Sequence, residues 1–166
     1  MTVYHGSTVP VEKPGIRKTE AFLDFGAGFY TTASYFQAER WAKIKMRRLN
    51  TAEGFVSVYD FDYESAKKDT EILRFLTANE EWLKFVVANR NGEIPFQKAD
   101  LVIGPVADDN VYRSIRLFET GVLDAEETVK RLKTEVLQDQ WTFCSEKILS
   151  YLTFTESKKI TGTESV

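Results

Sequence analysis

The sequence of 166 residues contains a single cysteine and a single histidine. Because one cysteine cannot form an internal disulfide, Cys144 indicates a reducing compartment, and we expect the cytoplasm. The lone histidine, without a CxxC or HExxH pattern, argues against the ordinary zinc sites, so we expect no metal. The chain also lacks the roughly 20 consecutive apolar residues of a membrane span. Its first ten residues lack the pattern of a signal peptide, and we expect no membrane partner.

Basic residues are slightly outnumbered, with 22 Lys and Arg against 25 Asp and Glu, which gives a net charge of -3. This balance argues against a broad surface for nucleic acid. Lys43, Lys45, Arg47 and Arg48 form a local basic cluster that could line a groove, although the simplest interpretation is the solvated face of a helix. The length fits one domain, which we expect over residues 1–156, followed by a polar tail over 157–166.

A phosphate-binding glycine loop is absent as well. Gly26-Ala27-Gly28 would need a third glycine at the position of Thr31, and the segment precedes a strand, whereas the dinucleotide-binding fingerprint follows one. There is no regular alternation of strands and crossover helices. Interspersed strands and helices therefore predict an α+β fold and not a doubly wound sheet.

Hydrophobic periodicity and turn residues predict the elements. Strands are expected over 3–5, 29–32, 55–61, 100–106, 141–144 and 151–155. Helices are expected over 35–49, over 68–90 with a break at 77–79, from 108 or 109 to about 118, from 124 to about 134, and over 146–149. Ser34, Asn79, Asp124 and Ser145 are predicted helix caps.

Two stretches have the composition of ligand sites. His5 ends a strand and is followed by Gly6 and Ser7, so backbone groups, an imidazole and a hydroxyl come together there. A partly buried structural histidine is the alternative. In the loop and strand over 24–32, the glycines permit close approach of a ligand, and Tyr30 offers a flat face.

Other candidate residues have ordinary interpretations when each is taken singly. Tyr30 and Trp41 are typical of a core, and Gln140 is typical of a surface although it opens an aromatic-rich strand. Cys144 fits a small buried hydrophobic residue better than a nucleophile. Glu146 fits the first turn of a helix.

Taken together, three motifs resemble those of the ADP-ribosyltransferase superfamily, in the His-Tyr-Glu clade of diphtheria toxin and the poly(ADP-ribose) polymerases. His5-Gly6-Ser7 resembles the first motif, Gly26-Ala27-Gly28-Phe29-Tyr30-Thr31-Thr32 the second, and Asp139-Gln140-Trp141-Thr142-Phe143 the strand that opens with the catalytic glutamate. The chain is also similar, over roughly residues 3–154, to a small bacterial branch with DFGxGFY, IGPVADD and DQ-aromatic-x-F segments.

The chain departs from the family pattern at three positions. Gln140 stands where the glutamate is expected, and Ala38 stands where the polymerases often have a serine. Trp41 replaces a second stacking tyrosine, which conserves stacking. The first departure bears directly on the type of reaction.

The resemblance implies an ADP-ribosyltransferase-like split β-sheet with flanking helices, and NAD as co-substrate without a metal. By resemblance, Gly6 would hold the nicotinamide amide, and His5 the adenosine ribose. Tyr30 and Trp41 would sandwich the nicotinamide ring, and Gln140 would hold a hydroxyl of the nicotinamide ribose. The implied catalytic residues are His5, Tyr30 and Gln140, and the implied NAD-binding residues are His5, Gly6, Ser7, Gly28, Phe29, Tyr30 and Trp41.

The resemblance therefore implies a mono-ADP-ribosyltransferase, a bacterial toxin or defence effector with an antitoxin or inhibitor protein as partner. A glutamine cannot act as a base, so single transfer is favoured over polymer synthesis. Asp100, Asp109 and Glu146 are acids that could supply a base instead. A non-catalytic NAD or ADP-ribose binding module and an NAD glycohydrolase are the alternatives. The acidic net charge favours a protein acceptor over nucleic acid.

Overall fold

The computed structural model describes residues 1–16, 23–93, 99–106, 109–132 and 138–161. These residues form a seven-stranded sheet in the order β4-β5-β6-β2-β1-β3-β7. The strands are β1 Thr2–Ser7, β2 Phe29–Thr32, β3 Glu53–Phe61, β4 Ile72–Arg74, β5 Leu101–Pro105, β6 Asp139–Phe143 and β7 Leu152–Thr161. The helices are α1 Tyr35–Leu49, α2 Tyr63–Asp69, α3 Glu80–Arg90, α4 Asp109–Glu119, α5 Ala125–Leu132 and α6 Glu146–Leu149.

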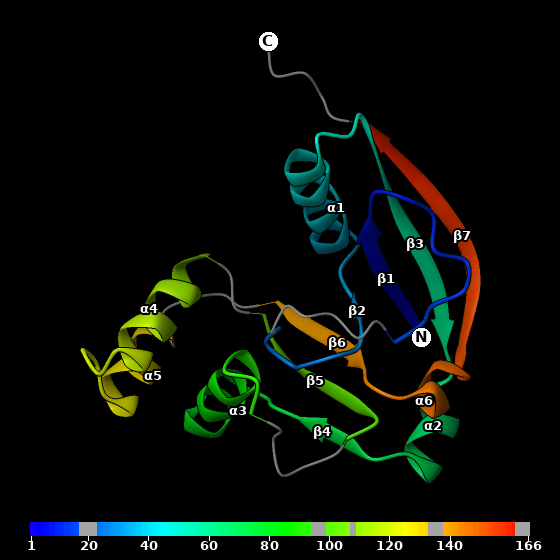
Figure 1. Ribbon diagram of the computed structural model, residues 1–166. Helices are drawn as coiled ribbons and strands as arrows, with labels where there is room; N and C mark the ends of the chain where they lie inside the picture. Colours follow the sequence, from blue (N-terminus) through cyan, green and yellow to red (C-terminus); the bar gives the residue numbers. More distant parts are fainter. Residues whose placement is uncertain (17–22, 94–98, 107–108, 133–137, 162–166) are drawn as a thin grey trace.

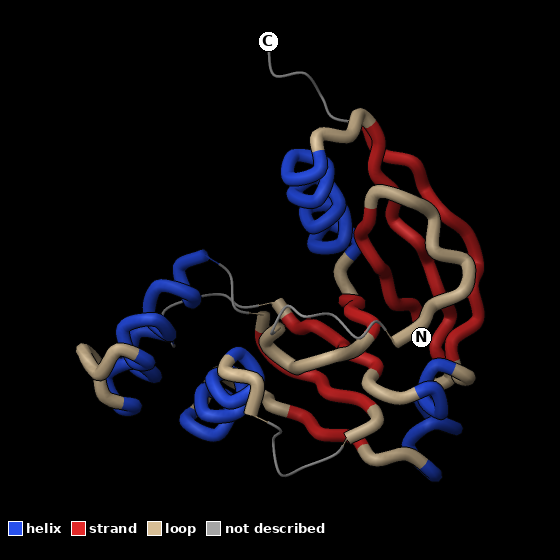
Figure 2. Tube along the Cα trace, in the orientation of Figure 1, coloured by secondary structure: helices blue, strands red, loops and turns tan. Residues whose placement is uncertain are grey.

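The sheet is mixed. β4 and β5 run parallel, whereas the other neighbouring strands are antiparallel. In Figure 2 helices lie beside the strands, and α3 connects the parallel strands β4 and β5. The predicted α+β class is therefore confirmed. None of the helices in the described ranges is both long and apolar enough to cross a membrane.

The neighbouring strands β1 and β2, near the middle of the sheet, pair over only a short stretch. β1 pairs with β3 along its whole length, from Thr2 to Ser7. It pairs with β2 at Tyr4 and Thr32. Figure 1 shows β1, β3 and β7 as one group of strands, from which β2, β6, β5 and β4 diverge. The end of β1 that carries His5 therefore lies at an opening in the sheet.

Side chains of the strands alternate between two apolar clusters. Phe29 of β2 and Trp141 and Phe143 of β6 belong to a cluster with Tyr59. The second cluster lies beneath α3, α4 and α5, and Tyr30 packs against it. Because neighbours on a strand point to opposite faces, Gln140 and Thr142 share a face with Tyr30.

Helix α1 begins and ends as the sequence predicts. The side chain of Ser34 accepts a hydrogen bond from the amide of Gln37 and caps the helix. Ala38, Ala42 and Met46 are spaced by four residues, and they are the buried face of α1. This face packs on β1, β2 and β3, next to the opening.

One predicted helix is partly wrong. Residues 80–90 form α3 and Asn79 caps it, as expected. The first part instead contains the strand β4, which pairs with β5. The cluster Ile72, Leu73, Phe75 and Leu76 fits a helical spacing, but the backbone hydrogen bonds to β5 decide the structure of these residues.

The predicted polar tail is also wrong for residues 157–161. They continue β7 and pair with β3, from Ser157 opposite Ser57 to Thr161 opposite Glu53. Ile160 is buried against Ala42 and Met46. Polar residues tolerate a strand here because β7 is an edge strand with one face towards solvent. Residues 162–166 lie outside the described ranges.

Candidate functional site

The three motifs that lie far apart in the sequence come together on neighbouring strands. His5 is on β1, Tyr30 on β2 and Gln140 on β6, and these strands are adjacent in the order β6-β2-β1. On β6, Gln140 lies opposite Thr32 of β2. Because β1 and β2 diverge beyond Tyr4, the candidate site lies at the opening between them.

His5 spans this opening with its side chain. Its Nδ1 lies 2.6 Å from the carbonyl oxygen of Tyr30. Because a carbonyl oxygen can only accept, Nδ1 donates this hydrogen bond. The imidazole stacks on Phe29 with ring centroids 4.5 Å apart. The imidazole is thus held in one orientation.

Gly6 is required by the packing of α1. A Cβ atom at this position would lie 1.9 Å from the carbonyl oxygen of Ala38 and 2.8 Å from the amide nitrogen of Ala42. Its carbonyl is also engaged, since Nζ of Lys45 donates to it over 2.7 Å. A ligand amide at the Gly6 carbonyl would have to replace this ammonium. Ser7 uses its hydroxyl locally and donates to the carbonyl of Val9 over 2.6 Å.

Tyr30 holds the glycine loop in place through its hydroxyl. The hydroxyl donates to the carbonyl of Gly26 over 2.6 Å and accepts from the amide of Phe25 over 3.1 Å. Burial raises the pKa of Tyr30 well above its ordinary value, and the charge of Asp24 acts in the same direction. The phenol therefore stays protonated near neutral pH and is not a base.

Packing explains Gly28 and Phe29, the other two implied NAD-binding residues of this loop and strand. A Cβ at Gly28 would lie 2.6 Å from Cγ2 of Thr142 and 2.8 Å from the carbonyl oxygen of Phe143, so only glycine fits against β6. Phe29 is buried in the core and supports His5. Their predicted contacts with NAD stay predictions.

Gln140 is the most unusual side chain of the site. It is 3 % exposed, and its Nε2 has no hydrogen-bond partner among the described residues. Thr142, two residues along the same face of β6, is fully buried, and its Oγ1 likewise has no such partner in the described ranges. A buried polar group without a partner costs about 1–3 kcal/mol, so such groups are typical of functional positions.

The residues of α1 that the resemblance singles out have different surroundings. Ala38 is fully buried and contacts the backbone of Gly6. Trp41 is partly exposed. Within the described ranges neither Trp41 nor Tyr30 stacks on another aromatic ring, and both stay candidates for stacking on a ligand.

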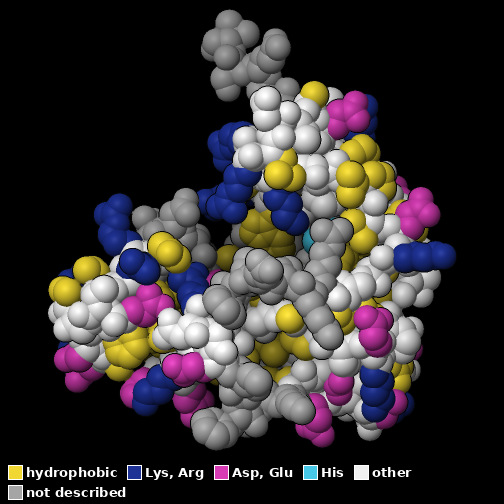
Figure 3. All heavy atoms as spheres, viewed as in Figure 1, with side chains coloured by type: hydrophobic (Ala, Val, Ile, Leu, Met, Phe, Trp, Pro, Cys, Tyr) yellow, Lys and Arg dark blue, Asp and Glu magenta, His cyan; other side chains and the backbone are white. Residues whose placement is uncertain are grey.

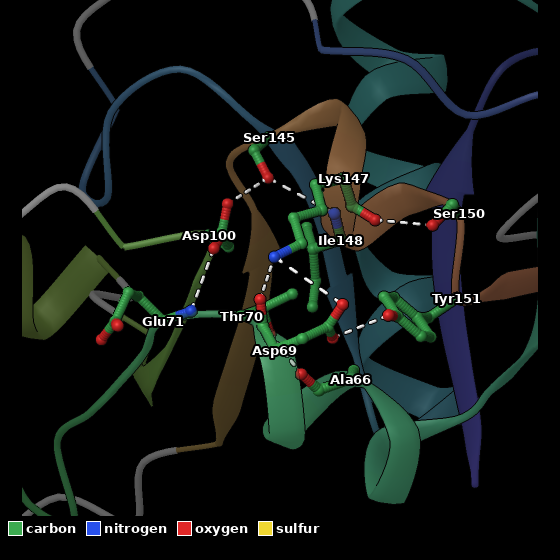
Figure 4. A network of polar contacts seen from close by, with 10 residues as sticks. All are labelled: Ala66, Asp69, Thr70, Glu71, Asp100, Ser145, Lys147, Ile148, Ser150 and Tyr151. Carbon is green, nitrogen blue, oxygen red and sulfur yellow. Dashed lines mark hydrogen bonds and ion pairs between the residues drawn. The ribbon is translucent and has the colours of Figure 1, made fainter.

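Two of the acids proposed as alternative bases, Asp100 and Glu146, have surroundings outside the candidate site. Asp100 belongs to the polar network of Figure 4, where its carboxylate accepts from the hydroxyl of Ser145 over 2.5 Å and from the amide of Glu71 over 2.9 Å. Glu146 is exposed on α6. The side chain of Asp109 lies outside the described part of the structure.

One acid that sequence reasoning passed over lies next to Gln140. Burial raises the pKa of Asp139, and the nearby Arg74 opposes this shift. Asp139 is partly exposed and opens β6. By strand alternation it points away from the face of Gln140. Its place directly before Gln140 was the only signal in the sequence.

Cys144 is partly buried and packs against the second apolar cluster. Burial raises the pKa of its thiol to about 12. The thiol donates weakly to the carbonyl of Thr142, with Sγ and O 3.4 Å apart. The described residues contain no group of three His, Cys, Asp or Glu side chains that could hold a metal ion.

The model of DUF3990, described as a protein of unknown function, matches residues 1–154. The chain belongs to the DUF3990 family. This match includes β1, β2 and β6 and therefore all three motif strands. No curated protein and no solved structure matched the chain.

Proposed function

We propose that this DUF3990 member is an NAD-dependent mono-ADP-ribosyltransferase that acts as a bacterial toxin or defence effector. The observation that carries the proposal is the arrangement of His5, Tyr30 and Gln140 on the adjacent strands β1, β2 and β6. This arrangement is what an ADP-ribosyltransferase-like split sheet requires, and the chain resembles that family at these three motifs.

The groups at the opening fit the parts of NAD. By the resemblance, the imidazole of His5 binds a ribose hydroxyl, and the Tyr30 carbonyl and the Phe29 ring hold this imidazole in its orientation. The unpartnered Nε2 of Gln140 can donate a hydrogen bond to a second ribose hydroxyl. Tyr30 and Trp41 supply flat faces for the nicotinamide ring.

The reaction breaks the bond between C1′ of the ribose and the nicotinamide nitrogen, and the electron pair leaves with nicotinamide. The ribose becomes cation-like until the acceptor's nucleophile attacks C1′ and loses its proton. Because nicotinamide leaves from a cation, no strong acid is needed, and the protein contributes mainly by orientation. Gln140 can orient the ribose, but it supplies neither charge nor a base.

An NAD or ADP-ribose binding module is the second candidate. It is favoured by Gln140, which replaces the carboxylate, and by the engagement of Asp100 elsewhere. An NAD glycohydrolase is an intermediate case, in which water is the acceptor. An antitoxin or inhibitor protein is the expected partner of a toxin.

Release of nicotinamide tests the proposal. The protein is incubated with NAD, first alone and then with cell lysate, and free nicotinamide is quantified by chromatography. We expect His5→Ala and Tyr30→Ala to abolish release and Gln140→Glu to preserve or raise it, whereas Glu146→Gln on exposed α6 is a matched control without effect. Retained NAD binding without release or a labelled product would contradict the enzyme and support the binding module.

A further inference from the structure

An exposed stripe runs along the side of α1 that faces away from the sheet. It consists of Phe36, Arg40, Lys43 and Arg47, which are spaced by four, three and four residues. Residues at this spacing lie on one line along a helix, and the line from Phe36 to Arg47 is roughly 16 Å long. We call these four residues the basic stripe.

The stripe is strongly cationic within an acidic protein. α1 carries five Lys and Arg but a single Glu, whereas the whole chain has a net charge of -3. Lys43 pairs with Glu39 over 2.5 Å. Arg40 and Arg47 are exposed and form no ion pair with any described residue. Figure 3 shows the resulting group of basic side chains over α1, beside a hollow with an apolar floor.

An aromatic ring stands at one end of the stripe. Phe36 is 82 % exposed, and its one ring contact among the described residues is with Tyr35, edge-on at 6.3 Å. Its faces are therefore open to a planar partner. An exposed aromatic ring in line with arginines is typical of surfaces that stack a base and bind the adjacent phosphates.

Two other anionic partners fit this surface less well. A membrane-bound helix must insert its apolar face, but the apolar face of α1, Ala38, Ala42 and Met46, is already buried on the sheet. An acidic peptide would neutralise the arginines but would leave Phe36 without a planar partner. Single-stranded nucleic acid uses both features.

We propose that the basic stripe binds single-stranded nucleic acid. The opposite side of the same helix contacts Gly6 through Ala38 and Lys45, so α1 stands between a strand bound at the stripe and the candidate site. If the proposed function holds, on which this step rests, the nucleic acid is the ADP-ribose acceptor. The net charge of the chain favoured a protein acceptor, whereas the basic stripe favours nucleic acid as the acceptor.

Fluorescence polarisation with labelled 12-nucleotide single-stranded DNA and RNA tests the stripe. Three cationic contacts predict that log Kobs falls with log salt with a slope of about −2, and Arg40→Ala with Arg47→Ala should reduce this slope to about −0.7. Phe36→Ala should weaken binding about tenfold without changing the slope. The DNA and RNA arms show whether either strand type is preferred.

The matched control is Lys67→Ala with Lys84→Ala, which removes two exposed charges from α2 and α3. The proposal is wrong if this control lowers the slope equally, if the wild type does not bind at 50 mM salt, or if poly-glutamate of equal charge competes as well as the oligonucleotide. The last result would indicate a protein acceptor. Nicotinamide release from NAD alone is measured in parallel, so loss of that activity is distinguished from loss of oligonucleotide binding.

Discussion

At the scale of single residues, hydrogen bonding shows which polar side chains have a structural explanation and which do not. Ser7, Tyr30 and Asp100 each bind a neighbouring group of the protein, and each contact has a structural explanation. Gln140 is buried, and its Nε2 lacks a partner among the described residues. Because a buried polar group without a partner lowers the free energy of unfolding, we expect a function to explain why Gln140 occupies this position.

The first prediction concerns Gln140→Leu. Leucine has nearly the same size and removes the unpartnered amide, so we expect the free energy of unfolding to rise by about 1 kcal/mol. Nicotinamide release should fall at least tenfold, because the ribose loses its orienting group. Urea denaturation and the release assay measure the two effects. A marked fall in stability would instead show that Gln140 is structural.

The second prediction concerns the thiol of Cys144. Its pKa of about 12 means that it stays protonated in the folded protein at pH 8, so a thiol reagent should react slowly until urea unfolds the chain. The unfolded thiol ionises at a lower pH than the folded thiol. At neutral pH the thiol is protonated in both states, so this difference in pKa does not lower the free energy of unfolding. As the pH rises towards 12, the thiol ionises only in the unfolded chain, and the free energy of unfolding falls. Cys144→Ala should reduce the alkaline loss and leave nicotinamide release unchanged.

At the scale of elements, the contact between β1 and α1 determines the shape of the site. The helix crosses β1 so closely that the position of Gly6 admits no side chain. Lys45 then reaches the Gly6 carbonyl. The buried face of α1 thus fixes one wall of the opening, and its outer face presents the basic stripe.

The third prediction tests this contact with Gly6→Ala. The added methyl would collide with the helix backbone at Ala38, which cannot move as a side chain can. We expect a loss of about 3 kcal/mol in the free energy of unfolding, at the upper end of the usual cost of overpacking. Gly15→Ala is the control, because a Cβ there meets nothing within 4 Å. Equal thermal stability of the two variants would contradict the packing explanation.

At the scale of the whole molecule, the sheet joins the two ends of the chain. β7, near the end of the sequence, pairs with β3, which pairs with β1 at its beginning. The strands that carry His5 and Gln140 are likewise far apart in sequence and near in space. The site therefore depends on cooperative assembly of the sheet.

The fourth prediction concerns residues 157–161. A chain shortened to residue 156 is compared with one shortened to residue 161. The shorter chain loses the end of the β3–β7 ladder and the burial of Ile160, so we expect its free energy of unfolding to be lower by about 3 kcal/mol. Urea denaturation measures the difference. Equal stability would show that this segment contributes nothing to the sheet.

The sequence alone determined the features that depend on near neighbours. The caps at Ser34, Asn79 and Ser145, and strands such as β2, follow from side-chain contacts within a few residues and from alternation. The sequence also indicated which three motifs to examine. Tertiary structure decided that β4 is a strand and that residues 157–161 belong to β7, because partners distant in sequence supply their hydrogen bonds.

The same distinction applies to the candidate site. The residue types of His5, Tyr30 and Gln140 are in the sequence, but the bond from His5 to the Tyr30 carbonyl, the ammonium at Gly6 and the unpartnered amide of Gln140 are not. Each of these depends on which strands lie side by side and where two of them separate. Composition and spacing do not contain that information, since long-range pairing and the packing of α1 determine it.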